Sequence, residues 1–387
     1  LDPEFRGMQP LIFLVEAIKG MTAMMVPLGA LAGGLCLATV VCGAVAGTFL
    51  TITDVGLNIY QLINGDQSLA QTLLNLGQAV YRHTPGTPQA ADRLVFAASD
   101  PSGGAGLQAD IMTLSSMGCH PLSVVTAVTI QDTTGVDDVS PIDAEWVADQ
   151  ARCVLEDMPV AAFKIGVLGS VETIAAIAEV VSDYPEIPLV LDPVLASGRG
   201  DELASEEMVA AIRELLVPQT TIITPNSLEA RRLALDESNE DDDPDLAECA
   251  RRLIASGCEY VLVTGTHENT SQVVNTLYGQ EGVLRSDSWQ RLPGSYHGSG
   301  CTLASAIAAT IANGLAIGDA VKDAQEYTWQ TLKSAFRPGM GQQIPDRLDR
   351  LVESALDDLP DEVASLVSNV VVQVEPDAPA DDPDLLG

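Results

Sequence analysis

Beyond residue 93, short apolar runs alternate with longer segments in which apolar residues recur at helical spacing. This alternation predicts an α/β fold, with a mainly parallel central sheet and helices on both of its faces. The predicted strands cover residues 94–98, 122–130, 161–165, 188–191, 221–224 and 260–263. The predicted helices cover residues 144–156, 171–182, 205–216, 245–256 and 317–336. A β-rich stretch at 273–285 precedes a glycine-rich turn and a further apolar helix.

The first 92 residues have a different character. Residues 1–7 are interpreted as a cloning remnant. Residues 21–52 contain no charged side chain, and roughly 20 apolar residues suffice to cross a bilayer. They are either a genuine membrane-associated segment or an appended, wrongly started region. The predicted organisation is a hydrophobic helical segment and linker at 8–92, the α/β domain at 93–352 and an acidic tail at 353–387.

The chain is strongly acidic. Its 54 Asp and Glu residues against 19 Lys and Arg residues give a formal net charge of −35. Such a surface repels phosphate backbones and disfavours nucleic acid as a partner. The acidic, lysine-poor composition is typical of proteins adapted to high salt, as in halophilic archaea. Seven cysteines without a C-x-x-C pair predict reduced thiols and a cytoplasmic protein, with membrane association through residues 21–52 left open.

Candidate chemistry begins at the glycine-rich turn. Gly298, Ser299, Gly300 and Cys301 lie where a helix starts, and the free N–H groups of a helix start together with its dipole bind anions. We therefore predict a phosphate site there. The same field lowers the pKa of a thiol, which makes Cys301 a candidate base or nucleophile. The alternative is a glycine-rich turn that only lets the helix pack closely.

Motifs also follow the predicted strands, where open α/β sheets bind their ligands. ASDPSGGAGLQAD, TAVTIQD, KIGVLGS, VLDPV, TPNSLEA and HGSGCT occur in this order. Together they resemble the hydroxymethylpyrimidine and phosphomethylpyrimidine kinases of thiamine biosynthesis, in the ribokinase superfamily. The resemblance spans residues 93–350. It implies two successive phosphoryl transfers from ATP, first to the hydroxymethyl group of 4-amino-5-hydroxymethyl-2-methylpyrimidine and then to the monophosphate.

The resemblance also implies roles for residues near the pyrimidine. Cys301 is the candidate general base of the first transfer. Gln131 is expected to pair with the pyrimidine, since its amide is both donor and acceptor. His297 is either a substrate contact or a structural loop residue. The other residues expected near the pyrimidine are Asp110, Gly104, Val167 and Val194.

A second set of residues is expected to bind ATP and Mg²⁺. Asn226 and Glu229 form an N-x-x-E motif, in which the carboxylate acts on Mg²⁺ through water. Asp192 is a second candidate acid. Thr264 and Gly265 occupy a loop in which many relatives carry a lysine, so this chain lacks a positive charge that would face phosphate.

Two alternatives stay open. A pyridoxal or pyridoxine kinase shares the fold and a similar loop, although Gln131 and Cys301 favour the pyrimidine. A membrane-tethered pyrimidine-binding protein with impaired kinase activity is consistent with the missing lysine and with residues 21–52. The sequence does not reveal the oligomeric state, but members of this superfamily are often dimeric, so a homodimer is a further expectation.

Overall fold

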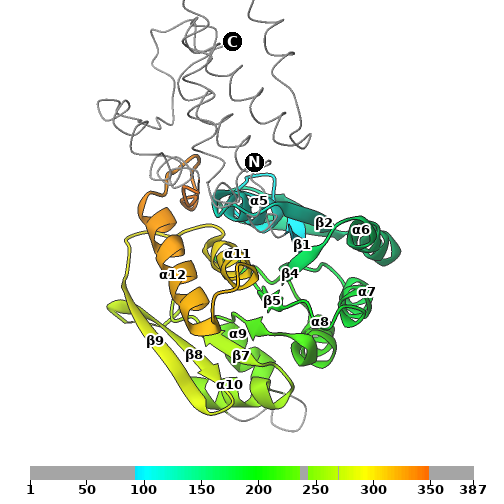
Figure 1. Cartoon of the computed structure of the whole chain (residues 1–387). Helices are drawn as coiled ribbons and strands as arrows, with labels where there is room; N and C mark the ends of the chain where they lie inside the picture. Colours follow the sequence, from blue (N-terminus) through cyan, green and yellow to red (C-terminus); the bar gives the residue numbers. More distant parts are fainter. Residues whose placement is uncertain (1–91, 236–242, 269, 348–387) are drawn as a thin grey trace, which may run out of the picture. The chain divides into compact units, whose positions relative to one another are not determined.

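A nine-stranded sheet runs through the part of the chain that the computed structural model describes, residues 92–235, 243–268 and 270–347 (Figure 1). The strand order is β3-β2-β1-β4-β5-β6-β7-β8-β9. The strands are β1 (Asp92–Ser99), β2 (Pro121–Gln131), β3 (Val136–Pro141), β4 (Val160–Ile165), β5 (Leu189–Leu191), β6 (Ile222–Ile223), β7 (Tyr260–Val263), β8 (Gln272–Gly279) and β9 (Gly282–Gln290). The predictions for residues 8–91 and 353–387 lie outside the described residues.

The centre of the sheet is parallel and its edges are not. β2, β1, β4, β5, β6 and β7 pair in parallel with one another. β3, β8 and β9 pair antiparallel with their neighbours. The predicted mainly parallel sheet is therefore confirmed. Because the parallel strands point the same way, the loops after them meet at one edge of the sheet.

Helices cover both faces (Figure 1). The helices are α5 (Gly106–Ser116), α6 (Ala144–Asp157), α7 (Val171–Ser182), α8 (Glu206–Ala211), α9 (Ser227–Ala234), α10 (Leu246–Ala255), α11 (Ser299–Ala312) and α12 (Ile317–Lys333). α6 to α10 pack on one face, and α5, α11 and α12 pack on the other. In β1, Leu94 and Phe96 pack into the core that α6 to α10 cover, whereas Val95 and Ala97 pack on the other face, against α5 and α11. A strand buried on both faces must be apolar throughout, which explains its continuous apolar run.

Polar side chains begin several helices. Ser170, Ser205 and Asp245 each accept a hydrogen bond from a backbone N–H in the first turn of α7, α8 and α10. Such caps satisfy donors that a helix start leaves free. The helix predicted at 205–216 is α8 followed by a wider π-helical turn at Ile212–Leu216. Pro218 lies in the short 3-10 helix that follows this turn.

The structure adds one strand that the apolar pattern did not predict. β3 has the sequence VDDVSP, and it forms by pairing with β2 across a short turn. The β-rich stretch predicted at 273–285 is the β8–β9 hairpin, which continues to Gln290. Among the described residues, none of the helices combines the length and apolar character that crossing a membrane requires. The apolar segment 21–52 is not among them.

Candidate active site at the carboxyl ends of the strands

The start of α11 reaches the edge where the parallel strands end. Gly298 lies against the loop after β1, where a Cβ on it would come within 2.0 Å of the Gly104 oxygen. Gly300 lies against the loop after β5, with its Cβ position 3.7 Å from Asp192 Oδ1. The structure thus brings the glycine-rich turn together with motifs that are distant in sequence.

The backbone at the start of α11 leaves amide groups free for a ligand. Gly298 has a φ of 76°, a left-handed conformation that favours glycine. The first helical bond runs from Thr302 N to Gly298 O at 2.9 Å. The amides of Ser299, Gly300 and Cys301 precede this bond, so they lie outside the helical ladder. This geometry is consistent with the predicted phosphate site.

Cys301 does not have the lowered pKa that its position at a helix start predicts. Its side chain is buried, and burial raises the pKa of the thiol to about 12 although the Lys164 ammonium opposes the rise. The prediction of a lowered pKa is therefore wrong, because the loss of solvent outweighs the helix field. The thiol lies close enough to the Asp192 carboxylate to lower the pKa of that group.

Asp192 follows β5 and is only 5% exposed. Burial raises its pKa to about 6, against the lowering effect of Lys164. Its Oδ2 atom has no hydrogen-bond partner among the described residues. A buried carboxylate oxygen without a donor is costly, so this atom is available to a ligand from outside the chain.

Asn226 and Glu229 form the start of α9. Asn226 Oδ1 accepts from the amides of Leu228 and Glu229 at 2.9 and 3.0 Å, and Glu229 Oε2 accepts from Asn226 N at 2.9 Å. This is a capping box. Glu229 Oε1 also accepts from Leu195 N at 3.3 Å. Burial and the nearby Asp192 raise the pKa of Glu229 to about 8.

Asp110 is buried below the site rather than facing it. Its side chain is 0% exposed. Its Oδ2 pairs with Lys164 Nζ at 2.9 Å and its Oδ1 accepts from Ser305 Oγ at 2.7 Å. The prediction that Asp110 contacts the pyrimidine conflicts with this burial, because both oxygens already have partners in the core.

Gln131 lies at the end of β2 beside His297. The Gln131 Nε2 and His297 Nε2 atoms are 3.2 Å apart, and His297 Nε2 is 2.9 Å from Asp100 Oδ2. Burial opposes ionisation of Asp100, but bonds from His297, Ser102 and the Ala105 amide outweigh it and lower its pKa to about 2. His297 therefore links the predicted pyrimidine residue to an ionised aspartate.

The remaining predicted residues line the same edge. Val167 and Val194 are half-buried in the loops after β4 and β5. Thr264 N donates to Pro225 O at 2.9 Å, which joins the loop after β7 to the start of α9. Gly265 N donates to Asn275 Oδ1 at 3.1 Å. The Gly265 amide is thus already paired, which conflicts with a direct contact from it to the nucleotide.

The comparison with known families agrees with this arrangement. A family model described as phosphomethylpyrimidine kinase matches residues 100–346. The chain belongs to the phosphomethylpyrimidine kinase family. The hydroxymethylpyrimidine/phosphomethylpyrimidine kinase of Escherichia coli is 37% identical over 251 residues, or 65% of this chain and 94% of the relative. A bifunctional thiamine biosynthesis protein of Geobacter sulfurreducens is 38% identical over 248 residues, or 64% of this chain and 50% of that protein.

Solved structures support the same fold. The pyridoxal kinase of Bacillus subtilis in an ADP complex matches with a TM-score of 0.61 and 29% identity, covering 70% of this chain and 100% of that one. The phosphomethylpyrimidine kinase of Clostridium difficile matches with a TM-score of 0.54 and 34% identity, covering 62% and 99%. The predicted ribokinase-like fold and kinase family are confirmed.

A kinase of this family implies a Mg²⁺ ion, and the oxygen donors present decide whether the site fits it. No group of three or more potential ligands lies together among the described residues. Mg²⁺ keeps several waters and needs few protein oxygens, so this does not argue against it. The unpaired Asp192 Oδ2 and the Glu229 carboxylate are hard oxygen donors at the carboxyl edge of the sheet. The residues present therefore fit the ion.

Three buried charged residues near the site were not predicted as site residues from the sequence. Asp100 bonds His297, and Lys164 pairs with Asp110 beneath Cys301. Arg347 Nη2 donates to Gly104 O at 2.9 Å and its Nε donates to Thr302 Oγ1 at 3.0 Å. Lys164 carried a signal that could have been used, since a lysine inside the apolar strand VAAFKI needs a buried partner.

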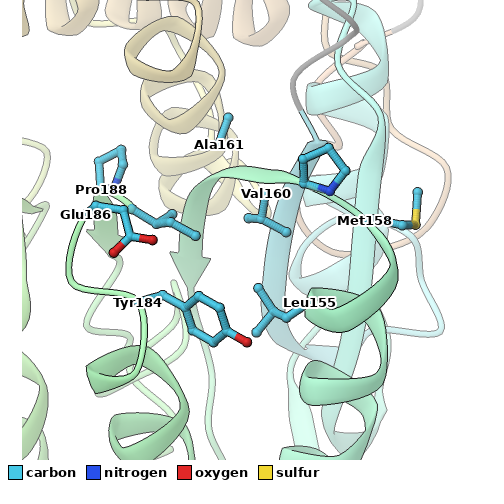
Figure 2. A pocket seen from close by; sticks show the side chains of 9 residues that line it. Leu155, Met158, Val160, Ala161, Tyr184, Glu186 and Pro188 are labelled. Atoms are coloured by element: carbon cyan, nitrogen blue, oxygen red, sulfur yellow. The ribbon is translucent and has the colours of Figure 1, made fainter.

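A separate cavity lies at the opposite edge of the sheet, among residues that precede β4 and β5 (Figure 2). It has a volume of about 360 Å³, and Leu155, Val160, Tyr184 and Pro188 are among the residues that line it. None of the predicted site residues contributes to it. The chemistry of this family is therefore assigned to the carboxyl edge and not to this cavity.

Proposed function

We propose that the chain transfers the γ-phosphoryl group of ATP to the hydroxymethyl group of 4-amino-5-hydroxymethyl-2-methylpyrimidine, and a second one to the resulting monophosphate. One observation carries the proposal: the free backbone amides at the start of α11 lie beside the Asp192 carboxylate, with the Cβ position of Gly300 3.7 Å from Asp192 Oδ1. Phosphoryl transfer needs such amides to neutralise the moving group, and a base for the acceptor. The curated relatives from Escherichia coli and Rhizobium meliloti carry both kinase names.

The first transfer requires removal of a proton. The hydroxymethyl oxygen bonds to the γ-phosphorus, the bond from that phosphorus to ADP breaks, and the hydroxyl proton must leave. Because the pKa of Asp192 is raised to about 6, its carboxylate is largely ionised at neutral pH and is still basic enough to accept this proton. Cys301, whose thiol lies beside Asp192, would relay the proton to that carboxylate. The amides of Ser299 to Cys301 stabilise the charge on the transferring group.

The second transfer does not need this base, because the accepting phosphate oxygen is already anionic. The Gln131 amide holds the pyrimidine edge in both steps, and its Nε2 lies 3.2 Å from His297 Nε2. Asp192 and Glu229 would hold Mg²⁺ through its waters, and the bound ion would neutralise charge on the ATP phosphates. Residues of the chain itself orient the substrates.

The test is an assay of ATP consumption with the hydroxymethylpyrimidine and with pyridoxal, at low and molar KCl, with Mg²⁺ and after EDTA. We expect Mg²⁺-dependent ADP formation with the pyrimidine, one ADP for each phosphoryl group transferred, and more turnover in molar salt. Faster turnover of pyridoxal would identify the chain with the pyridoxal kinases, which its structural neighbours include. Pyrimidine binding without turnover at any salt concentration would identify an impaired, binding-only protein.

We also propose that the kinase is a cytoplasmic homodimer. Val128 and Ile130 are neighbours on one side of β2 and remain 47% and 62% exposed. A second copy over this strand would remove their apolar surface from water. Light scattering in molar salt should give the mass of a dimer, and a monomer at assay concentration would contradict the proposal. Replacing both residues with serine should shift the mass towards that of a monomer.

A further inference from the structure

We propose that Arg291 is a positioning residue that shapes the loop after β7, residues 264–268, into a phosphate-binding turn. The inference rests on the proposed function, in which this loop faces ATP. Arg291 comes directly after β9, so it approaches the loop from the β8–β9 hairpin. It belongs to none of the motifs that carry the family resemblance.

Arg291 binds the loop through its backbone carbonyls. Its Nη1 donates to Thr266 O, its Nη2 donates to Glu268 O and its Nε donates to Thr270 O, each at 2.9 Å. A longer bond of 3.5 Å runs from Nη2 to Gly265 O. The donors of one guanidinium are therefore divided among four carbonyls. Bonds from a charged donor are stronger than neutral ones, so this contact fixes the loop firmly.

The direction of these carbonyls determines where the amides point. A trans peptide is planar and holds its C=O and N–H on opposite sides. No cis peptide occurs among the described residues. Because Gly265 O and Thr266 O point towards Arg291, the N–H groups of Thr266 and His267 point away from it. Both residues are exposed, and two successive amides that face the same side form an anion-binding concavity.

Gly265 is held from its other side. Its amide donates to Asn275 Oδ1, and Asn275 Nδ2 donates to Gln325 Oε1 at 2.9 Å in the core. A Cβ on Gly265 would come within 2.2 Å of Val274 O, so only glycine fits this contact. The loop therefore begins at a rigid point and is turned by Arg291. Its own residues from Thr264 to Thr270 include no lysine or arginine, so Arg291 also supplies positive charge beside it.

The experiment measures the Kd of ADP by calorimetry and the KM values of ATP and of the pyrimidine. It compares the wild-type chain with Arg291→Ala, Arg291→Lys and the control Arg285→Ala. Arg285 lies within β9 of the same hairpin but pairs with Asp287 at 2.6 Å instead of the loop. For Arg291→Ala we expect the Kd of ADP and the KM of ATP to rise about tenfold, because charged hydrogen bonds are lost. The KM of the pyrimidine should stay within about twofold of wild type.

Arg291→Lys keeps the charge but not the fork of donors, so an intermediate Kd for ADP supports the positioning role. An unchanged Kd and KM in both Arg291 variants would overturn it. So would an equal loss for ATP and pyrimidine with a lowered melting temperature, since that indicates a purely structural residue. If Arg291→Ala does not fold, Arg291→Lys decides between these outcomes. A wild-type chain that neither binds ADP nor turns over would refute the proposed function instead.

Discussion

The pKa values of buried carboxylates shift in opposite directions in the two halves of the site. On the pyrimidine side, Asp100 receives hydrogen bonds from His297, Ser102 and the Ala105 amide, and its pKa is lowered to about 2. On the nucleotide side, burial raises the pKa of Asp192 to about 6 and that of Glu229 to about 8. The first side is electrostatically complete within the chain. On the second side, Lys164 lowers the pKa of Asp192 but does not offset the effect of burial.

This difference indicates which kind of ligand each half of the site is suited to bind. A complete set of donors around Asp100 lets the chain hold the shape of a neutral pyrimidine pocket before any ligand arrives. Buried carboxylates with raised pKa values favour the arrival of a cation, because the ion offsets the cost of burying their charge. The asymmetry therefore matches a neutral substrate on one side and a nucleotide with its Mg²⁺ on the other.

The largest effect should come from Asp192→Asn. It removes the proposed proton acceptor and the unpaired Oδ2, so kcat of the first transfer should fall about a hundredfold to ten-thousandfold. The melting temperature should not fall, because the neutral amide keeps the size of the carboxylate and avoids the cost of burying its charge. Steady-state kinetics and a thermal scan measure both. Asp201→Asn, in an exposed loop where Ser197 donates to the carboxylate, serves as the matched control. Full activity of Asp192→Asn would remove the distinction between the two halves.

Cys301→Ala tests the junction between the halves. Its thiol lies beside Asp192, and only the first transfer has a hydroxyl proton to remove. We expect the first transfer to slow by about tenfold to a hundredfold, and the second by much less. Separate assays with the free alcohol and with the monophosphate measure this ratio. Equal slowing of both steps would assign Cys301 a packing role.

The smallest effect concerns the pH dependence of stability on the pyrimidine side. The folded pKa of Asp100 lies below its ordinary value of 3.8, so ionised Asp100 stabilises the fold above that pH. The stabilisation, about 2 kcal/mol, should disappear as the pH falls from about 4 towards 2. Urea unfolding of wild type and Asp100→Asn at pH 7 and pH 3 should show a difference that shrinks at pH 3. Asp137→Asn, exposed on β3, should show little difference at either pH. A gap that is constant with pH would mean that Asp100 acts through packing.

Much of the fold could be predicted because the central strands are apolar on both faces. β1, β4 and β5 are buried on two sides, so their runs stand out without any knowledge of neighbours. β3 could not be predicted this way. Its VDDVSP sequence has no apolar run, and it becomes a strand only because β2 offers a free edge.

Site residues could be predicted where the groups that interact lie together in one short sequence motif. The start of α11 satisfies this condition, and so does the cap of α9. The spacing of Asn226 and Glu229, however, is that of a capping box as well as of a metal motif, so sequence alone cannot separate the two roles. Lys164 and Asp110 lie far apart in the chain, and their pairing depends on how β4 packs against α5. The pKa of Cys301 likewise depends on burial that no local pattern contains.

Arg347 has a practical consequence for anyone who trims the chain. Its guanidinium joins Gly104, in the first strand-end loop, to Thr302 in α11. A shortened version that stops before this arginine would keep every strand and helix that the structure describes. It would lose the guanidinium that joins the two glycine-containing loops. Crystallisation or display variants should therefore retain this residue at the border of the catalytic unit.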